Sequence, residues 1–388
     1  MIDESLLDAT EELLRADPRG LLRAVAAAGA HVRTAVRGAE ESELTRLRPE
    51  GRPGTVLVAG SGPEARLVAD LYDALAEDGL RAARLRPTGA LAAPGALTWP
   101  LPRWAGPLDL LLITSAEGTE PGLSLLVEAA HRRGCAIVTV TPAGSPLADA
   151  TRNRRNLVIP HSPSPHHEPA AHPGAPGPGW ALVAPLLLLG DRLDLFEADR
   201  ESLLAMADAL DAVAERCGPT SRTHGNPAKT LAAEFAAALP LLWSEGPVAR
   251  AAARHAAATL TGLAGRPTLT APLPEALTAH GALLGGDLAP GAGDPDDFFR
   301  DRVDEPAPLH ARVLLLRGPL PETEGETAGA AAAARQLAFE QGTAFGELET
   351  SATAGPDPAP NPLVVAAELI AQLDFAAVYL ALAAGPRT

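Results

Sequence analysis

The segment Thr55–Leu75, "TVLVAGSGPEARLVADLYDAL", joins a short apolar run to a helical pattern through a glycine-rich turn. The run Thr55–Ala59 predicts a buried strand, and Gly60–Gly62 predicts a tight turn into the helix. Further apolar runs follow, with helical stretches between them: "RAARLRP", "LDLLLITS", "AIVTVTP" and "NLVIP". Because strands that alternate with helices form βαβ units, this half of the chain is expected to build a doubly wound parallel sheet.

The second half repeats the same plan. The stretch that begins at Leu239, "LPLLWSEGPVARAAARHAAATL", has the pattern of a strand, a glycine turn and a helix. Later strand candidates are "PTLTAP", "ARVLLLRG" and "AFGELET". The repeated order predicts an α/β protein with two parallel sheets, built by internal duplication of one fold.

A segment rich in proline, glycine and histidine divides the two halves. We expect a helical segment at 1–47, a first α/β domain at 48–160, a linker at 161–179 and a second α/β domain with a helical lead-in at 180–388. The linker contains His161, His166, His167, His172 and Glu168. These side chains could bind a metal, but a flexible segment without fixed ligand spacing favours a plain linker.

The length and composition of the chain exclude several classes of protein. A chain of 388 residues is long enough for two domains, and its net charge of −16 argues against a nucleic-acid partner, which requires a basic face. The two cysteines, Cys135 and Cys217, are too far apart for a disulfide framework or a zinc cluster. The acidic N-terminus does not resemble a signal peptide, and the apolar run "WALVAPLLLLG" is too short to span a bilayer. We therefore expect a soluble, cytoplasmic protein without a membrane partner.

Lys229 is the only lysine among the 32 lysine and arginine residues. The preceding residues predict a helix start, with Asn226 as the N-cap and Pro227 in the first helical position. A cation in the first turn opposes the helix dipole, so surface optimisation does not explain this lysine. We expect Lys229 to have a structural role, reaching a cluster of carbonyls or a carboxylate across the domain seam.

Five stretches in order carry a resemblance to a known family. They are "GSG" at Gly60–Gly62, "TSAEGTEPG" at Thr114–Gly122, "NPAKTLA" at Asn226–Ala232, "LPLLWSEGPVARAAAR" at Leu239–Arg254 and "DFAAVYLAL" at Asp374–Leu382. Together they resemble the bacterial and archaeal bifunctional phosphoglucose/phosphomannose isomerases. The resemblance implies two tandem SIS (sugar isomerase) domains, each a three-layer αβα sandwich, in a homodimer. It also implies aldose–ketose interconversion of hexose 6-phosphates without a metal or an organic cofactor.

The resemblance implies a phosphate-binding loop at the end of the strand "LDLLLITS". The family's Ser-Tyr-Ser-Gly-Asn-Thr-Glu aligns with Thr114–Glu120, so one serine has become Ala116, and Glu117 brings a carboxylate towards the phosphate. Such loops hold phosphate with hydroxyls and with the N–H groups of a helix N-terminus. The residues implied to bind substrate are Gly60, Ser61, Gly62, Thr114, Ser115, Thr119 and Arg254.

The implied catalytic positions have changed. The family's glutamate base, which moves a proton between C1 and C2, falls on Gly262, and its ring-opening histidine falls on Thr278. Glu275 and His280 lie nearby and are candidate substitutes, although a shift of two helical positions turns a side chain away, so His280 is favoured as a surface or supporting residue. Family members also continue beyond the last matched stretch with a helix that lines the pocket, whereas this chain stops at Thr388.

Three functions stay open at this point. The first is a diverged protein that binds a hexose phosphate or a related small molecule and has weak or lost isomerase activity. The second is a working isomerase that uses Glu275 and His280 together with Arg254. The third is a structural or regulatory partner of a sugar-nucleotide enzyme that binds no sugar.

Overall fold

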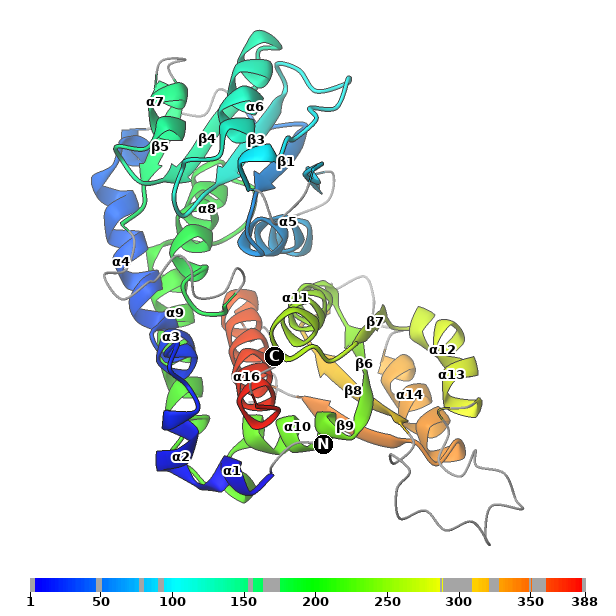
Figure 1. Ribbon diagram of the computed structural model, residues 1–388. Helices are drawn as coiled ribbons and strands as arrows, with labels where there is room; N and C mark the ends of the chain where they lie inside the picture. Colours follow the sequence, from blue (N-terminus) through cyan, green and yellow to red (C-terminus); the bar gives the residue numbers. More distant parts are fainter. Residues whose placement is uncertain are drawn as a thin grey trace, which may run out of the picture. The chain divides into compact units, whose positions relative to one another are not determined.

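A computed structural model describes most of the chain. The described residues are 4–46, 51–76, 80–89, 94–152, 156–162, 175–286, 288, 309–320, 328–348, 350 and 361–385. The chain forms two compact units (Figure 1). The first-sheet unit is Arg23–Asp211, and the second-sheet unit combines Met1–Leu22 with Ala212–Thr388. Each unit is described below by itself.

The first-sheet unit contains a five-stranded parallel sheet in the order β2-β1-β3-β4-β5. Its strands are β1 (Thr55–Gly60), β2 (Arg81–Arg84), β3 (Asp109–Thr114), β4 (Ala136–Thr141) and β5 (Leu157–Pro160). The helices around it are α3 (Leu21–Ala26), α4 (Ala28–Glu41), α5 (Glu64–Leu75), α6 (Pro121–Arg132), α7 (Pro146–Arg152), α8 (Trp180–Arg192) and α9 (Arg200–Arg216), of which α3 and α9 cross the unit boundaries. The central strands are continuous apolar runs because helices cover both faces of the sheet.

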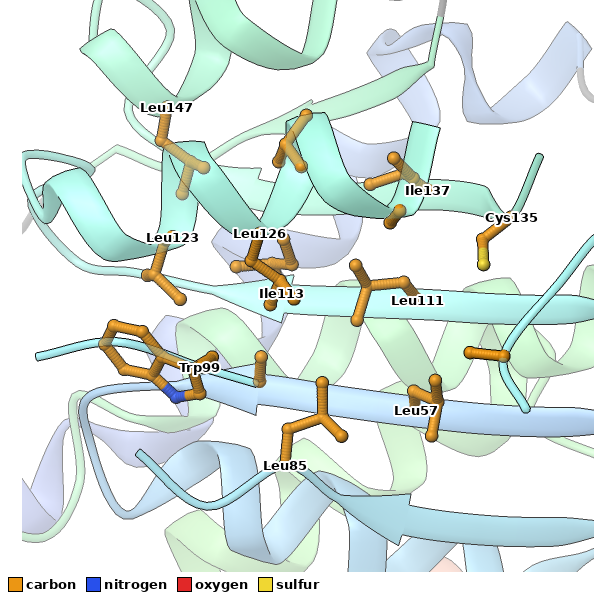
Figure 2. Packing of buried hydrophobic residues seen from close by; sticks show 14 of the residues in the cluster. Leu57, Leu85, Trp99, Leu111, Ile113, Leu123, Leu126, Cys135, Ile137 and Leu147 are labelled. Carbon is orange, nitrogen blue, oxygen red and sulfur yellow. The ribbon is translucent and has the colours of Figure 1, made fainter. Parts of the chain in front are cut away.

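One face of this sheet carries a core under helix α6 (Figure 2). Leu57, Leu111 and Ile113 project from β1 and β3, and Leu123 and Leu126 of α6 pack against them. The alternation along each strand sends one set of side chains to this face and the other set to the helices behind the sheet. The packing fixes the carboxyl ends of β1 and β3 next to each other.

The second-sheet unit contains a four-stranded parallel sheet in the order β7-β6-β8-β9. Its strands are β6 (Ala238–Glu245), β7 (Leu269–Pro272), β8 (His310–Arg317) and β9 (Ala344–Leu348). Its helices are α1 (Glu4–Asp8), α2 (Thr10–Arg15), α10 (Pro227–Ala236), α11 (Pro247–Ala264), α12 (Glu275–Ala279), α13 (Gly281–Gly285), α14 (Ala328–Glu340) and α16 (Pro362–Ala383). Every predicted strand segment forms a strand, so the prediction of an α/β fold with two parallel sheets flanked by helices is confirmed.

The compact units divide the chain differently from the predicted boundaries. Helix α8 packs on α4 and α5 of the first-sheet unit, so it is not a lead-in to the second domain. At the other end, α1 packs on α16, which joins the N-terminal residues to the second-sheet unit. Residues 163–174, most of the predicted linker, lie outside the described residues together with His166, Glu168, His167 and His172. The boundaries of the compact units are set by the packing of helices, which cannot be read from the composition along the chain.

The N-terminal segment, predicted to be helical at 1–47, is divided into several short helices over its described residues. Residues 4–46 form helices α1 to α4 and a short 3-10 turn at Glu43–Arg46. A break falls at Asp17–Gly20, where the Asp17 carboxylate accepts hydrogen bonds from the backbone N–H groups of Leu21 (2.8 Å) and Leu22 (2.9 Å). A carboxylate that satisfies these free donors starts a new helix, so the apolar pattern continues through separate helices.

Helix α16 is long and apolar enough to cross a membrane, but 89% of its most apolar window is buried inside the structure. It packs against α10 and α11. This burial is the behaviour of a core helix, and length and composition by themselves are weak evidence for a membrane span.

Candidate functional site

The ends of β1 and β3 bring three hydroxyls together in the first-sheet unit. Gly60 of β1 pairs with Thr114 of β3 in the parallel register. Ser61 and Ser115 are the residues that follow these two strands. A Cβ atom on Gly60 would lie 2.5 Å from the Thr114 Oγ1 atom, so only glycine fits beside this threonine. The carboxyl edge of a parallel sheet is the usual ligand-binding edge of α/β folds.

Each hydroxyl implied to bind phosphate has a carboxylate as a hydrogen-bond partner. The Glu120 carboxylate accepts two hydrogen bonds, one at Oε1 from the Ser61 hydroxyl (2.6 Å) and one at Oε2 from the Ser115 hydroxyl (2.7 Å). The Thr114 hydroxyl donates to Glu64 Oε1 at 3.4 Å. The exposed Thr119 hydroxyl donates to Glu117 Oε2 at 3.3 Å. The loop that was expected to receive an external anion therefore holds the protein's own carboxylates.

Burial separates the inner carboxylates from the outer one. Glu64 and Glu120 are each 8% exposed, and Thr114 and Ser115 are fully buried, whereas Glu117 is exposed. Burial has the largest effect and raises the pKa of Glu64. A backbone hydrogen bond and the Thr114 hydroxyl lower this pKa, the negative charge of Glu120 raises it, and the charge of Arg84 lowers it. Because desolvation disfavours a charged carboxylate, Glu64 keeps its proton to higher pH than an exposed glutamate does.

The turn of the loop lies at Gly118. Gly118 has a φ of +69°, and its N–H donates to the Ser115 Oγ atom at 2.6 Å. Because a positive φ favours glycine, Gly118 suits this position of the turn.

The remaining predicted site residues lie in the second-sheet unit. Arg254 is exposed on α11, and Gly262, in the position of the family base, has open space where a side chain would be. Glu275 is exposed as the first residue of α12. Thr278, in the position of the family histidine, is exposed and donates its hydroxyl to the Glu275 backbone oxygen at 3.0 Å. Gly60, Ser61 and Gly62 belong to the other unit with the hydroxyl loop.

His280 is buried in the core of this unit and is not a surface residue. Its Nδ1 atom accepts a hydrogen bond from the Trp243 Nε1 group at 2.9 Å. Burial also lowers the pKa of His280, which favours the neutral ring. Glu275 is in contact with solvent and His280 with the core, so the structure does not bring the two candidates together as an acid–base pair.

The corresponding edge of the second sheet also holds an internal charge pair. Glu245 ends β6, and its Oε2 atom accepts a hydrogen bond from the Arg317 Nε group at 2.9 Å. The Glu245 side chain is 2% exposed. The sequence does not reveal this pair, because the partner of Glu245 comes from the neighbouring strand β8.

Lys229 is enclosed by backbone carbonyls. Its ammonium donates to the carbonyl oxygens of Pro219 (2.9 Å) and Ser221 (2.7 Å) and lies 5.5 Å from the centre of the Tyr379 ring. Asn226 caps helix α10 by accepting the N–H groups of Ala228 and Lys229, as the sequence predicts. All these partners belong to the second-sheet unit, so the lysine holds one unit together and does not reach across the seam.

The structure offers no metal cluster among the residues it describes: no group of three or more histidine, cysteine, aspartate or glutamate side chains there could hold an ion. Of the linker histidines, only His161 belongs to this part of the chain, and its backbone N–H donates to Thr141 O at 2.9 Å.

Comparisons with known proteins agree with this architecture. Residues 224–386 match the sequence model of the bacterial phospho-glucose isomerase C-terminal SIS domain. No curated protein sequence matches the chain.

Solved structures resemble the whole chain. A protein from Silicibacter pomeroyi that is assigned as a phosphosugar isomerase is 17% identical, with a TM-score of 0.55 over 91% of this chain and 95% of the other. Glucosamine-6-phosphate deaminase from Thermotoga maritima is 11% identical, with a TM-score of 0.58 over 94% and 95%. The C-terminal domain of glucosamine-fructose-6-phosphate aminotransferase from Francisella tularensis is 10% identical, with a TM-score of 0.54 over 93% and 96%. These similarities show the tandem SIS fold.

Proposed function

We propose that this chain is an SIS-type protein that binds a hexose phosphate or a related carbohydrate and whose aldose–ketose isomerase activity is weak or lost. The tandem SIS fold and the matched C-terminal domain support the carbohydrate class. The observation that carries the loss of activity is His280, which is buried with its Nδ1 atom bonded to Trp243. The protein is further proposed to be a cytoplasmic homodimer, a state that light scattering during size-exclusion chromatography would test.

The two positions that the resemblance implies for the acid and the base of an isomerase do not carry acid–base side chains. Gly262 has no side chain that can take a proton, and the exposed Thr278 hydroxyl is bonded to a backbone oxygen. A positioned acid or base contributes roughly 10²–10⁴-fold to the rate, so the loss of both removes most of the acceleration. A binding function survives this loss because it requires only donors, acceptors and an enclosed surface.

The test combines turnover with binding. A coupled assay measures fructose 6-phosphate formed from glucose 6-phosphate and from mannose 6-phosphate, and thermal denaturation is followed with the same sugars. We expect no measurable turnover and a concentration-dependent rise of the melting temperature with a carbohydrate. Turnover above about 1 s⁻¹, within the ordinary range of enzymes, would overturn the proposal. Variants Glu275→Gln and His280→Gln would then show whether these residues carry the reaction.

A second candidate is a structural or regulatory partner that binds no sugar. It is favoured by the hydrogen bonds of Ser61 and Ser115, which are already made to Glu120. This candidate predicts neither turnover nor any shift of the melting temperature with sugars, which separates it from the carbohydrate-binding function.

A further inference from the structure

We propose that Glu120 makes the loop at the first-sheet edge select against phosphate, so that the carbohydrate bound there is neutral or carries an amine. This inference rests on the proposed carbohydrate-binding function and names the class of ligand. Glu120 acts as a specificity-determining residue because it occupies the donors that a phosphate would need.

The geometry of one carboxylate carries the argument. The two oxygens of Glu120 are held by hydroxyls from two separate loops, Ser61 after β1 and Ser115 after β3, at 2.6 and 2.7 Å. The Ser61 distance is at the short end for O–H donors, and both distances fall in the range found when the acceptor is charged. Glu120 itself is 8% exposed. A phosphate could take these hydroxyls only after the carboxylate had left, so one internal anion blocks the place of an external one.

Two further glutamate side chains flank the Glu120 carboxylate. Glu64 lies on the inner side of the loop and Glu117 on the outer side, where each accepts the neighbouring threonine hydroxyl. The cation that acts on the inner side is Arg84, whose charge is felt by Glu64. A phosphate dianion that enters from the open side meets the carboxylates of Glu117 and Glu120, and like charges at short distance disfavour its binding.

The carboxylates of the loop favour a sugar without phosphate. Its hydroxyl or ammonium groups are donors, and carboxylate oxygens that already accept one hydrogen bond retain acceptor capacity. The exposed Glu117 carboxylate and Thr119 hydroxyl lie at the open side of the loop, where such a ligand would first make contact. The hydrogen bonds from Ser61 and Ser115 already fix the two oxygens of Glu120, so these acceptors would not have to move when the sugar binds.

Binding of inorganic phosphate, fructose 6-phosphate, fructose and glucosamine to four proteins tests this inference. They are the wild type, Glu120→Ala, Glu120→Gln and the control Glu117→Ala, which removes one negative charge from the exposed side of the same loop. Calorimetric titration gives the affinities, and circular dichroism confirms that each variant is folded. We expect at least a tenfold gain in phosphate affinity for Glu120→Ala, and much smaller gains for Glu117→Ala and for Glu120→Gln, in which an amide still fills the space.

A double variant, Glu120→Ala with Ser115→Ala, should lose most of the gain, because the freed hydroxyl is the proposed phosphate donor. The inference is overturned if the wild type binds fructose 6-phosphate at least tenfold more tightly than fructose, or if folded Glu120→Ala gains no affinity for phosphate. Failure of the proposed function looks different: the wild type then binds neither fructose, glucosamine nor fructose 6-phosphate. The phosphate titrations of the variants still decide the role of Glu120 in that case.

Discussion

At the scale of single residues, the buried Glu64 makes the free energy of unfolding depend on pH. Its carboxyl group is buried beside Glu120, and burial raises its pKa above the ordinary value of 4.5. The folded protein therefore binds this proton more tightly than the unfolded chain does. The associated stability is complete below pH 4.5 and is lost as the pH rises through the folded-state pKa.

Glu64→Gln should consequently be more stable than the wild type at neutral and alkaline pH, because glutamine never carries the buried charge. The advantage should shrink as the pH falls towards 4.5. Urea unfolding at pH 5, 6, 7 and 8 measures it, with the exposed Glu117→Gln as a control that should show little change. A stability difference that stays constant over this pH range would contradict the assignment.

The second residue to test is Lys229, whose side chain is 0% exposed. Lys229→Ala removes the ammonium that donates to the Pro219 and Ser221 carbonyl oxygens and opens a cavity, so we expect a loss of about 2–4 kcal/mol in the free energy of unfolding. Lys229→Arg should cost about 1–3 kcal/mol, because the larger guanidinium does not fit an enclosed space shaped around an ammonium. Denaturant unfolding measures both.

The exposed substitution Arg132→Lys is the matched control for this pair, and it should change stability by no more than about 0.5 kcal/mol. If Lys229→Arg is equally neutral, the enclosed geometry is not the reason that a single lysine occurs in an arginine-rich chain.

At the scale of elements, helices α11 and α16 are joined by a buried polar pair. The His255 Nε2 and Asp374 Oδ1 atoms are 2.9 Å apart, and the Asp374 side chain is 2% exposed. Thr259, one turn further along α11, lies 3.4 Å from the same His255 nitrogen. An apolar helix thus carries one aspartate into its interface, where a partner must satisfy it.

His255→Ala is expected to destabilise the second-sheet unit by about 3–5 kcal/mol, because it leaves the Asp374 carboxylate buried and unpaired. Replacing both residues with leucine should recover most of this loss, since an apolar pair has no charge to desolvate. Chemical denaturation of the wild type, His255→Ala and the double leucine variant measures both losses. Equal losses in His255→Ala and in the double variant would show that packing, and not the unpaired charge, sets the cost.

At the scale of the whole molecule, the two units have separate cores. Leu111 belongs to the cluster of the first-sheet unit, and Leu315 belongs to that of the second-sheet unit. Both side chains are fully buried, so truncation of either leucine to alanine should cost about 2–5 kcal/mol in its own unit.

Calorimetry should therefore resolve two unfolding transitions, with Leu111→Ala lowering the melting temperature of one and Leu315→Ala that of the other. A shift of both transitions by either substitution, or a single transition in the wild type, would show that the units unfold as one.

The sequence by itself determined what depends on near neighbours in the chain. The apolar runs gave every strand, the glycine turns placed the ends of β1 and β6, and Asn226 with Pro227 marked the start of helix α10. These features follow from backbone sterics, hydrogen bonding of free N–H groups and the period of apolar residues, all of which act over a few residues.

Only the tertiary structure decided which side chains meet. Ser61 and Ser115 lie on different strands, and their common contact with Glu120 follows from the parallel pairing of β1 with β3. The burial of His280 likewise depends on the tertiary packing that brings the junction of α12 and α13 to Trp243 of β6. The sequence places a hydroxyl, a carboxylate or an imidazole at a turn, but its partner comes from a distant segment, and that partner determines its charge and its chemistry.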